Sequence, residues 1–191
     1  MAYLLDANVF ISAHRLHYSF DVCPGFWAWL DLAFQAGSVC SIDAIAEELL
    51  GHDDQLADWV RLRRSMFAEP AEPTVADIDA ISQVNRWANE STHYTDAAKA
   101  QFALAADSFV VGQALAGNHT VVTHERPSNS KHRIKIPNAA AQFQLRVRSP
   151  FVMLRSERAR FELARPNEQQ QMPLPLIDPA RSAAVGRNEA D

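Results

Sequence analysis

The chain has 191 residues, of which 48% are hydrophobic, and a formal net charge of −5. This length suits one compact domain with a tail, and the apolar content is sufficient for a core. No apolar run approaches the roughly eighteen residues of a membrane-spanning helix, and the N-terminus does not resemble a signal peptide. Its two cysteines, Cys23 and Cys40, cannot form a disulfide framework, so we expect buried reduced thiols in a cytoplasmic protein.

Short apolar runs alternate with segments of helical periodicity along the chain. Strands are expected at residues 3–5, 39–42 and 120–123, the last because of its β-branched residues. Helices are expected at 24–36, 44–50, 53–67, 75–87, 97–115 (as one helix or two), after Pro137, and at 150–163. Asp43 is expected to cap the second of these helices. The alternation at 134–136 predicts a short extended strand with one polar face.

Strands that alternate with helices predict an α/β fold, with three layers (α/β/α) around a mainly parallel sheet of four or five strands. We expect this domain to span residues 1–165. Residues 166–191 hold a glutamine run, several prolines and little apolar periodicity, and they are predicted to be a disordered tail.

Charge is distributed unevenly along the sequence. Residues 1–125 carry 6 basic and 17 acidic side chains, whereas residues 126–165 carry 10 basic and 2 acidic ones. A basic stretch beside an acidic body indicates a polyanionic partner next to a carboxylate-rich site. A charged helix face in solvent explains the pattern equally well, and the sequence leaves both interpretations open.

Carboxylates follow the predicted strands, where binding sites form in parallel sheets. Asp6 directly follows the first strand, and Glu125 lies two residues beyond the strand at 120–123. Glu47 and Glu48 lie on the helix after the second strand, and Asp107 interrupts an apolar run. Each acid alone is ordinary, because most acids lie in solvent. Several converging carboxylates, however, are the oxygen ligands that Mg²⁺ prefers.

Four segments resemble the motifs of PIN-domain nucleases, in the order in which that family has them. They are residues 3–11 with Asp6 and Asn8, Glu48-Leu49, residues 106–114 with Asp107, and residues 121–125 with Thr123 and Glu125. Residues 26–30 and 134–137 further resemble an uncharacterised prokaryotic PIN-like subfamily. The resemblance covers roughly residues 3–155.

The resemblance implies an endoribonuclease that uses Mg²⁺ or Mn²⁺. Carried over by position, the catalytic and metal-binding acids are Asp6, Glu48, Asp107 and Glu125, while Asn8 and Thr123 orient the ligands. Glu47 is the alternative to Glu48. Glu125 stands where many PIN domains have Asp, and residues 108–112 hold no acid, which favours one bound ion over two.

Partners follow from the resemblance and from the basic segment. RNA is the expected substrate, with Lys131, Arg133 and Lys135 as phosphate contacts because they closely follow Glu125. The alternative for Lys135 is an internal ion pair. Many similar proteins are toxins of toxin–antitoxin modules, so an antitoxin protein is a further candidate partner, as is a second copy of the chain. An inactive PIN-like module that binds RNA or protein is the alternative function.

Overall fold

A computed structural model describes residues 1–67 and 74–162 of the chain, and the tail predicted at 166–191 therefore lies outside the described residues. The described residues up to Phe161 belong to one structural unit. Its sheet has four strands, β1 (Tyr3–Leu5), β2 (Val39–Cys40), β3 (Thr120–Val122) and β4 (Val147–Arg148). They are all parallel and follow the order β2-β1-β3-β4.

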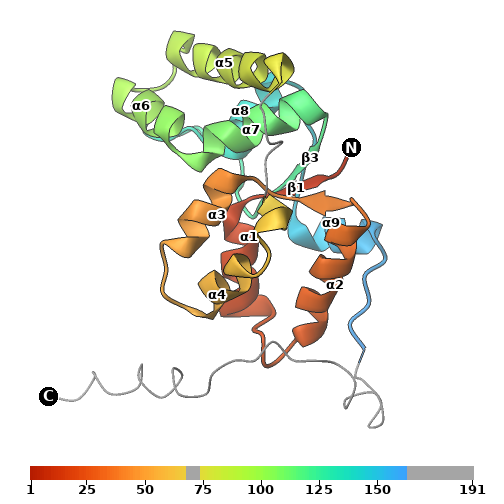
Figure 1. The fold of residues 1–191 in the computed structure, drawn as a ribbon. Helices are drawn as coiled ribbons and strands as arrows, with labels where there is room; N and C mark the ends of the chain where they lie inside the picture. The colour runs from red at the N-terminus through yellow and green to blue at the C-terminus, as the bar shows by residue number, and fades with distance from the viewer. Residues whose placement is uncertain (68–73, 163–191) are drawn as a thin grey trace, which may run out of the picture. The chain divides into compact units, whose positions relative to one another are not determined.

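Helices cover both faces of this sheet. Along the chain they are α1 (Ala7–Ser12), α2 (Pro24–Gln35), α3 (Asp43–Leu50), α4 (Gln55–Arg61), α5 (Val75–Glu90), α6 (Asp96–Leu104), α7 (Ala106–Gly117), α8 (Ile136–Gln142) and α9 (Pro150–Ser156). A π-helical turn (Ala13–His17) extends α1, and a 3₁₀ helix (Arg64–Phe67) follows α4. Figure 1 shows α5, α6, α7 and α8 on one side of the strands and α1, α2, α4 and α9 on the other. The expected three-layer α/β/α architecture is confirmed.

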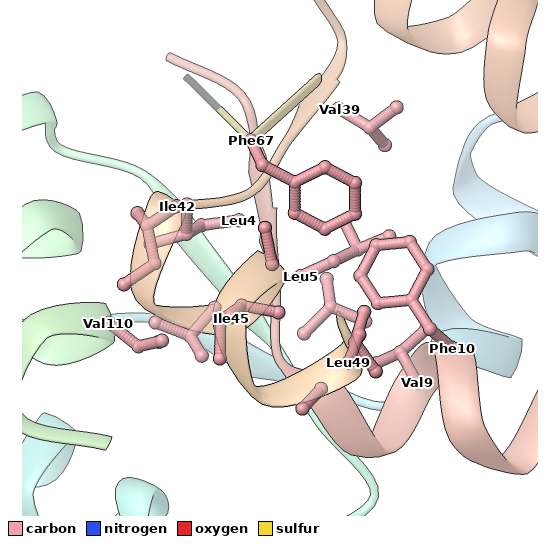
Figure 2. Packing of buried hydrophobic residues seen from close by; sticks show 14 of the residues in the cluster. Leu4, Leu5, Val9, Phe10, Val39, Ile42, Ile45, Leu49, Phe67 and Val110 are labelled. Carbon is pink, nitrogen blue, oxygen red and sulfur yellow. The ribbon is translucent and has the colours of Figure 1, made fainter. Parts of the chain in front are cut away.

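The core forms around β1, whose residues Leu4 and Leu5 are each 1% exposed. Figure 2 shows Phe10 of α1 and Phe67 close together beside this strand, and their ring centroids are 5.3 Å apart. Helix α3 contributes Ile45 to the same cluster and contacts both α1 and α7. Burial of these side chains stabilises the fold by roughly 1.5–3 kcal/mol each. This packing fixes the ends of β1 and β3, where the candidate site lies.

Several expected elements differ from the structure in length. The strand expected at 39–42 ends at Cys40, because the Ser41 hydroxyl donates to the backbone carbonyl of Leu5 at 2.7 Å. The helix expected at 53–67 is α4 followed by the 3₁₀ helix, and the last helix ends at Ser156. The open choice at 97–115 resolves into two helices, because Ala105 is extended, with φ −83° and ψ 155°.

Two local predictions were wrong. Residues 134–136 form no strand: Ile134 and Ile136 are both buried in the core, and Ile136 already begins α8. Asp43 does not cap α3, because Ile42 occupies the cap position and the Asp43 carboxylate instead forms an ion pair with Arg64. Strand β4 and helix α1 were not anticipated at all.

Within the described part of the chain, no helix combines the length and the apolar character needed to cross a membrane. Cys23 and Cys40 are free thiols, and they are partly buried where buried thiols were expected.

Candidate acidic site

The strand order places a reversal of the chain path between β1 and β3. From β1 the chain moves to β2 on one side, and it then returns past β1 to β3 on the other. Residues that follow adjacent strands at such a reversal face a common crevice, which is where ligands bind in open parallel sheets. Asp6 directly follows β1 and Thr123 directly follows β3. The Asp6 amide donates to the Val122 carbonyl at 3.0 Å, which ties the two strand ends together.

Asp6, Asn8 and Thr123 form a hydrogen-bonded network at these strand ends. The Thr123 hydroxyl donates to Oδ2 of Asp6 at 2.8 Å, and the Asn8 amide donates to the same oxygen and to the Thr123 hydroxyl. The amide oxygen of Asn8 accepts from the backbone N–H of His124 at 2.9 Å. Both side-chain donors therefore fix one oxygen of Asp6. Among the described residues, no side-chain donor bonds to Oδ1.

Glu125 lies beside this network but is held by other partners. Its side chain is 10% exposed and lies 3.3 Å from Nζ of Lys135 and 3.4 Å from a guanidinium nitrogen of Arg133. Its Oε2 also accepts from the backbone N–H of Ile136 at 3.0 Å, at the start of α8. Glu125 therefore anchors the loop that leads from β3 to α8.

Asp107 lies in the first turn of α7 and faces a pocket of about 210 Å³. Glu48 and Arg133 line the same pocket. Glu47, the alternative to Glu48, is absent from that lining and lies 3.0 Å from Arg64 in an ion pair. Of the two adjacent glutamates, only Glu48 thus lies near Asp107.

The electrostatics of the site couple these acids. The pKa of Asp6 is raised to about 7, chiefly by burial and also by the charges of Asp107 and Glu125, despite the Thr123 hydrogen bond that lowers it. Burial also raises the pKa of Asp107 to about 6, with contributions from Glu125 and Glu48 that Arg133 and Lys135 partly oppose. Carboxylates that raise one another's pKa are stabilised when a cation neutralises them.

The chemistry of these residues suits a divalent ion held by few protein ligands. Within residues 1–67 and 74–162, no three Asp, Glu, His or Cys side chains are arranged to hold a metal. Mg²⁺ keeps several waters and commonly takes only one or two carboxylates from the protein. Two carboxylates fit that requirement. Among the described residues, Oδ1 of Asp6 has no side-chain donor, and the carboxylate of Asp107 has no hydrogen bond or ion pair. Their donor set is hard and anionic, as Mg²⁺ and Mn²⁺ prefer.

The three basic residues expected to contact phosphate lie in different environments. Lys131 is exposed, and its backbone carbonyl accepts from the Thr95 amide at 3.0 Å. Arg133 and Lys135 pair with Glu125, so the internal ion pair considered for Lys135 is present. Their charges therefore already balance one acid of the site.

Sequence reasoning missed a second pocket, of about 550 Å³, at the ends of β3 and β4. Arg126 and Arg148 line it together with His124 and Phe151. The charge asymmetry pointed to Arg126 and Arg148 as part of a basic segment. Nothing in the sequence identified β4, so their meeting at one pocket could not be anticipated.

The fold and this crevice define a parallel α/β domain with a partly buried acidic site at the carboxyl ends of its central strands. Residues 3–161 match the model of a family described as a domain of unknown function, DUF4411, and the chain belongs to this family. The comparison with curated proteins gave no match.

Proposed function

We propose that this domain is a Mg²⁺- or Mn²⁺-dependent endoribonuclease, a hydrolase that cuts RNA phosphodiester bonds in the cytoplasm. The observation that carries the proposal is Asp6: a buried carboxylate at the strand reversal, with a pKa raised to about 7 by burial and by Asp107 and Glu125. A strongly shifted acid in a crevice is a candidate for function. The resemblance of the segments around Asp6, Glu48, Asp107 and Glu125 to PIN-domain motifs gives the reaction class.

Each residue has a defined part in this proposal. Asp6 and Asp107 would hold the ion, with Glu48 and Glu125 at its margin. When bound, the ion would supply charge stabilisation for a phosphoryl group and lower the pKa of water. Thr123 and Asn8 hold Oδ2 of Asp6, so that its carboxylate plane is fixed before substrate binds.

Lys131, Arg133 and Lys135 would contact phosphates of the RNA. For Arg133 and Lys135 this requires that the phosphate compete with Glu125, their present partner. The expected products carry a 5′-phosphate and a 3′-hydroxyl.

The test is cleavage of single-stranded RNA in Mg²⁺ or Mn²⁺, with EDTA as the metal-free control. We expect Asp6→Asn and Asp107→Asn each to lower the cleavage rate by at least about a hundredfold, because each removes a charge that the ion requires. Asp79→Asn, an exposed acid of α5, should cut like the wild type. An Asp107→Asn protein that cuts at the wild-type rate would refute the site.

The adjacent glutamates of α3 provide a matched pair. Glu48→Gln should slow cleavage, because Glu48 shares the pocket of Asp107. Glu47→Gln should not, since Glu47 pairs with Arg64. The reverse result would exchange the two assignments.

A second candidate function is an inactive PIN-like module that binds RNA or protein. The engagement of Glu125 by Lys135, Arg133 and the Ile136 amide favours it, because an acid held in this way is not free for an ion. Metal-dependent cutting that Asp6→Asn abolishes separates the two functions.

Within the nuclease proposal, the domain acts as the toxin of a toxin–antitoxin module. Growth arrest on expression of the wild type, but not of Asp6→Asn, tests that role, and co-purification tests for an antitoxin or a homodimer.

A further inference from the structure

The larger pocket, at the ends of β3 and β4, is not used by the site described above. It is built from the segment that follows β3, the end of β4, and helices α8 and α9. We propose that this pocket binds one nucleotide of a single-stranded RNA, next to the acidic site. The inference rests on the proposed function and names the part of the substrate that the pocket receives. A pocket of about 550 Å³ falls in the range of sites that hold a nucleotide-sized ligand.

Two arginines give the pocket affinity for an anion. Arg126 follows β3 and Arg148 ends β4, and both are exposed. Neither forms an ion pair within the part of the chain that the structure describes, and the Arg148 guanidinium donates to the carbonyl of the preceding residue, Val147, at 3.1 Å. Arg133 and Lys135 differ, because Glu125 already pairs with both. The pocket thus carries two arginine charges without an ion-pair partner among the described residues. Arginine can donate two parallel hydrogen bonds to a phosphate group.

Aromatic rings give the same pocket a surface for a base. His124 and Phe151 both line it, with ring centroids 5.9 Å apart in an edge-to-face arrangement. His17, on the π-helical turn, packs against both rings at 5.7 Å and 5.4 Å. Phe151 is nevertheless 38% exposed. An aromatic side chain held by its neighbours but open to solvent can stack a base of any identity, as single-strand binding requires.

The pocket is connected to the acids by residues that belong to both. Thr123 and Glu125 line it, and the Thr123 hydroxyl is bonded to Asp6. Arg133, which pairs with Glu125 at 3.4 Å, lines the smaller pocket of Glu48 and Asp107. A nucleotide bound by Arg148 and Phe151 would therefore bring the neighbouring phosphate of the strand toward Asp6. Single-stranded RNA is favoured over a duplex, because a base inside a helix is stacked and cannot enter a side pocket.

The experiment measures binding without cleavage. The full chain carrying Asp6→Asn is titrated in EDTA against a short fluorescein-labelled single-stranded RNA, and anisotropy is followed across a salt series. Arg126→Ala and Arg148→Ala are expected to weaken binding about five- to tenfold each and to lower the salt slope by about one. Phe151→Ala is expected to weaken binding about tenfold with an unchanged slope, because stacking releases no counterions.

Matched controls separate these effects from general ones. Arg86→Ala removes an exposed arginine of α5 that has no ion pair among the described residues. Val152→Ala changes an apolar residue that is 39% exposed and adjacent to Phe151 in the sequence. Both should bind like the parent. Phe151→Leu keeps an apolar side chain and should behave like Phe151→Ala, and thermal melting confirms that each variant is folded.

Equal affinities for Arg148→Ala, Phe151→Leu and the two controls would overturn the inference. The inference would also be overturned if the pocket variants weakened binding of a duplex of the same length as much as they weaken binding of the single strand, because the pocket would then be a general phosphate contact. Failure of the pocket can be distinguished from failure of the nuclease assignment. If the pocket variants lose binding but the wild type never cuts, the proposed activity fails and the pocket stands. If the wild type cuts and the pocket variants bind normally, only the pocket fails.

Discussion

Thr123 connects more of the site than any of the acids does. The residue is 2% exposed. Its hydroxyl donates to Asp6, and it accepts from the Asn8 amide and from the Glu125 backbone N–H, the latter at 3.0 Å. One hydroxyl thereby joins the end of β1 to the end of β3. Loss of a buried hydroxyl leaves its partners unsatisfied, which costs more than the hydrogen bond contributes when formed.

Thr123→Val tests this connection. The change keeps the shape of the side chain but removes the donor to Asp6, so we expect the free energy of unfolding to fall by about 1–3 kcal/mol. Thr120→Val is the matched control, because Thr120 is also a buried threonine, at the start of β3, and its hydroxyl forms none of these hydrogen bonds. Urea unfolding compares the two. Equal losses for both variants would show that the network adds nothing beyond the β-strand environment.

Asp6 should make the stability of the metal-free protein depend on pH. Its pKa is about 7 in the folded chain against an ordinary value of 3.8. Between about pH 4 and pH 7 the unfolded chain therefore loses this proton while the folded chain keeps it, and the free energy of unfolding falls as the pH rises. Asp107, whose pKa is raised to about 6, acts in the same direction.

We expect Asp6→Asn to flatten this pH dependence and to be more stable than the wild type at pH 8 in EDTA. Urea midpoints at several pH values measure the effect, with Asp79→Asn as the control for loss of an exposed charge. Parallel curves for wild type and Asp6→Asn would contradict a buried, proton-binding Asp6.

At this scale the sequence predicted part of the site. Asp6, Asn8 and Thr123 occur in short motifs next to strands. Those motifs predicted that Asn8 and Thr123 orient an acid, and both side chains do donate hydrogen bonds to Asp6. An internal ion pair of Lys135 was considered, but Glu125 as its partner and the Ile136 amide as a second donor could not be anticipated, because they depend on the path of the ten residues that separate Glu125 from Ile136. Such a path leaves no periodic signal in the sequence.

At the scale of elements, the close packing of α5 on α7 holds Asp107 in place. Gly112 of α7 lies against Ile81 of α5, and a Cβ at this position would lie 2.6 Å from Ile81 Cγ1 and 3.1 Å from its Cα. Because one of these atoms belongs to the backbone of α5, a side-chain rotation of Ile81 cannot relieve the close contact. A methyl group here would separate the two helices and shift the first turn of α7.

Gly112→Ala is therefore expected to lower the free energy of unfolding by about 1–3 kcal/mol, the usual range for overpacking. Gly25→Ala in α2 is the control, because the nearest atom to a Cβ there is a Phe161 side-chain carbon at 3.7 Å. Alanine favours helix by about 1 kcal/mol over glycine, so this control should be neutral or stabilising. Thermal unfolding of the two variants gives the comparison, and a stabilised Gly112→Ala would contradict the packing.

Elements with strong periodicity were predictable, and the exceptions have local causes. Helix α2 begins at Pro24, as its sequence indicates, and ends one residue before the expected position. The break at Ala105 could not be predicted, because the surrounding residues are good helix formers and no glycine or proline marks the extended residue. Ile134 and Ile136 alternate like a strand, but both point into the core from a loop and a helix start.

At the scale of the whole chain, the uneven charge acquires a structural meaning. The acidic residues of the site follow β1 and β3 or lie on α3 and α7, whereas the basic residues follow them in the segment from Arg126 onward. Part of this basic charge is used internally, since Arg133 and Lys135 balance Glu125. Arg126 and Arg148 remain without acidic partners among the described residues. Within the described residues, the basic segment therefore contains both charges that are paired internally and charges that are not.

Divalent ions should stabilise the whole domain if the acids bind them. A ligand that binds only the folded state raises the melting temperature, and a cation also removes the repulsion among Asp6, Asp107 and Glu125. We expect Mn²⁺ to raise it at least as much as Mg²⁺, because transition ions usually bind a given site more tightly. The shift should be larger at pH 8 than at pH 6. At the lower pH Asp6, with its pKa of about 7, holds a proton that the metal must displace.

Thermal scans in EDTA, Mg²⁺ and Mn²⁺ at both pH values measure these shifts. Asp6→Asn should abolish them, whereas Asp79→Asn should keep them, because its exposed acid on α5 is not part of the site. The pH dependence separates site binding from weak screening of surface charge, since surface acids are already ionised at both values. Identical curves for the wild type at millimolar metal would exclude an ion at Asp6 and favour the inactive module. A shift that persists in Asp6→Asn would place the ion elsewhere on the acidic half of the chain.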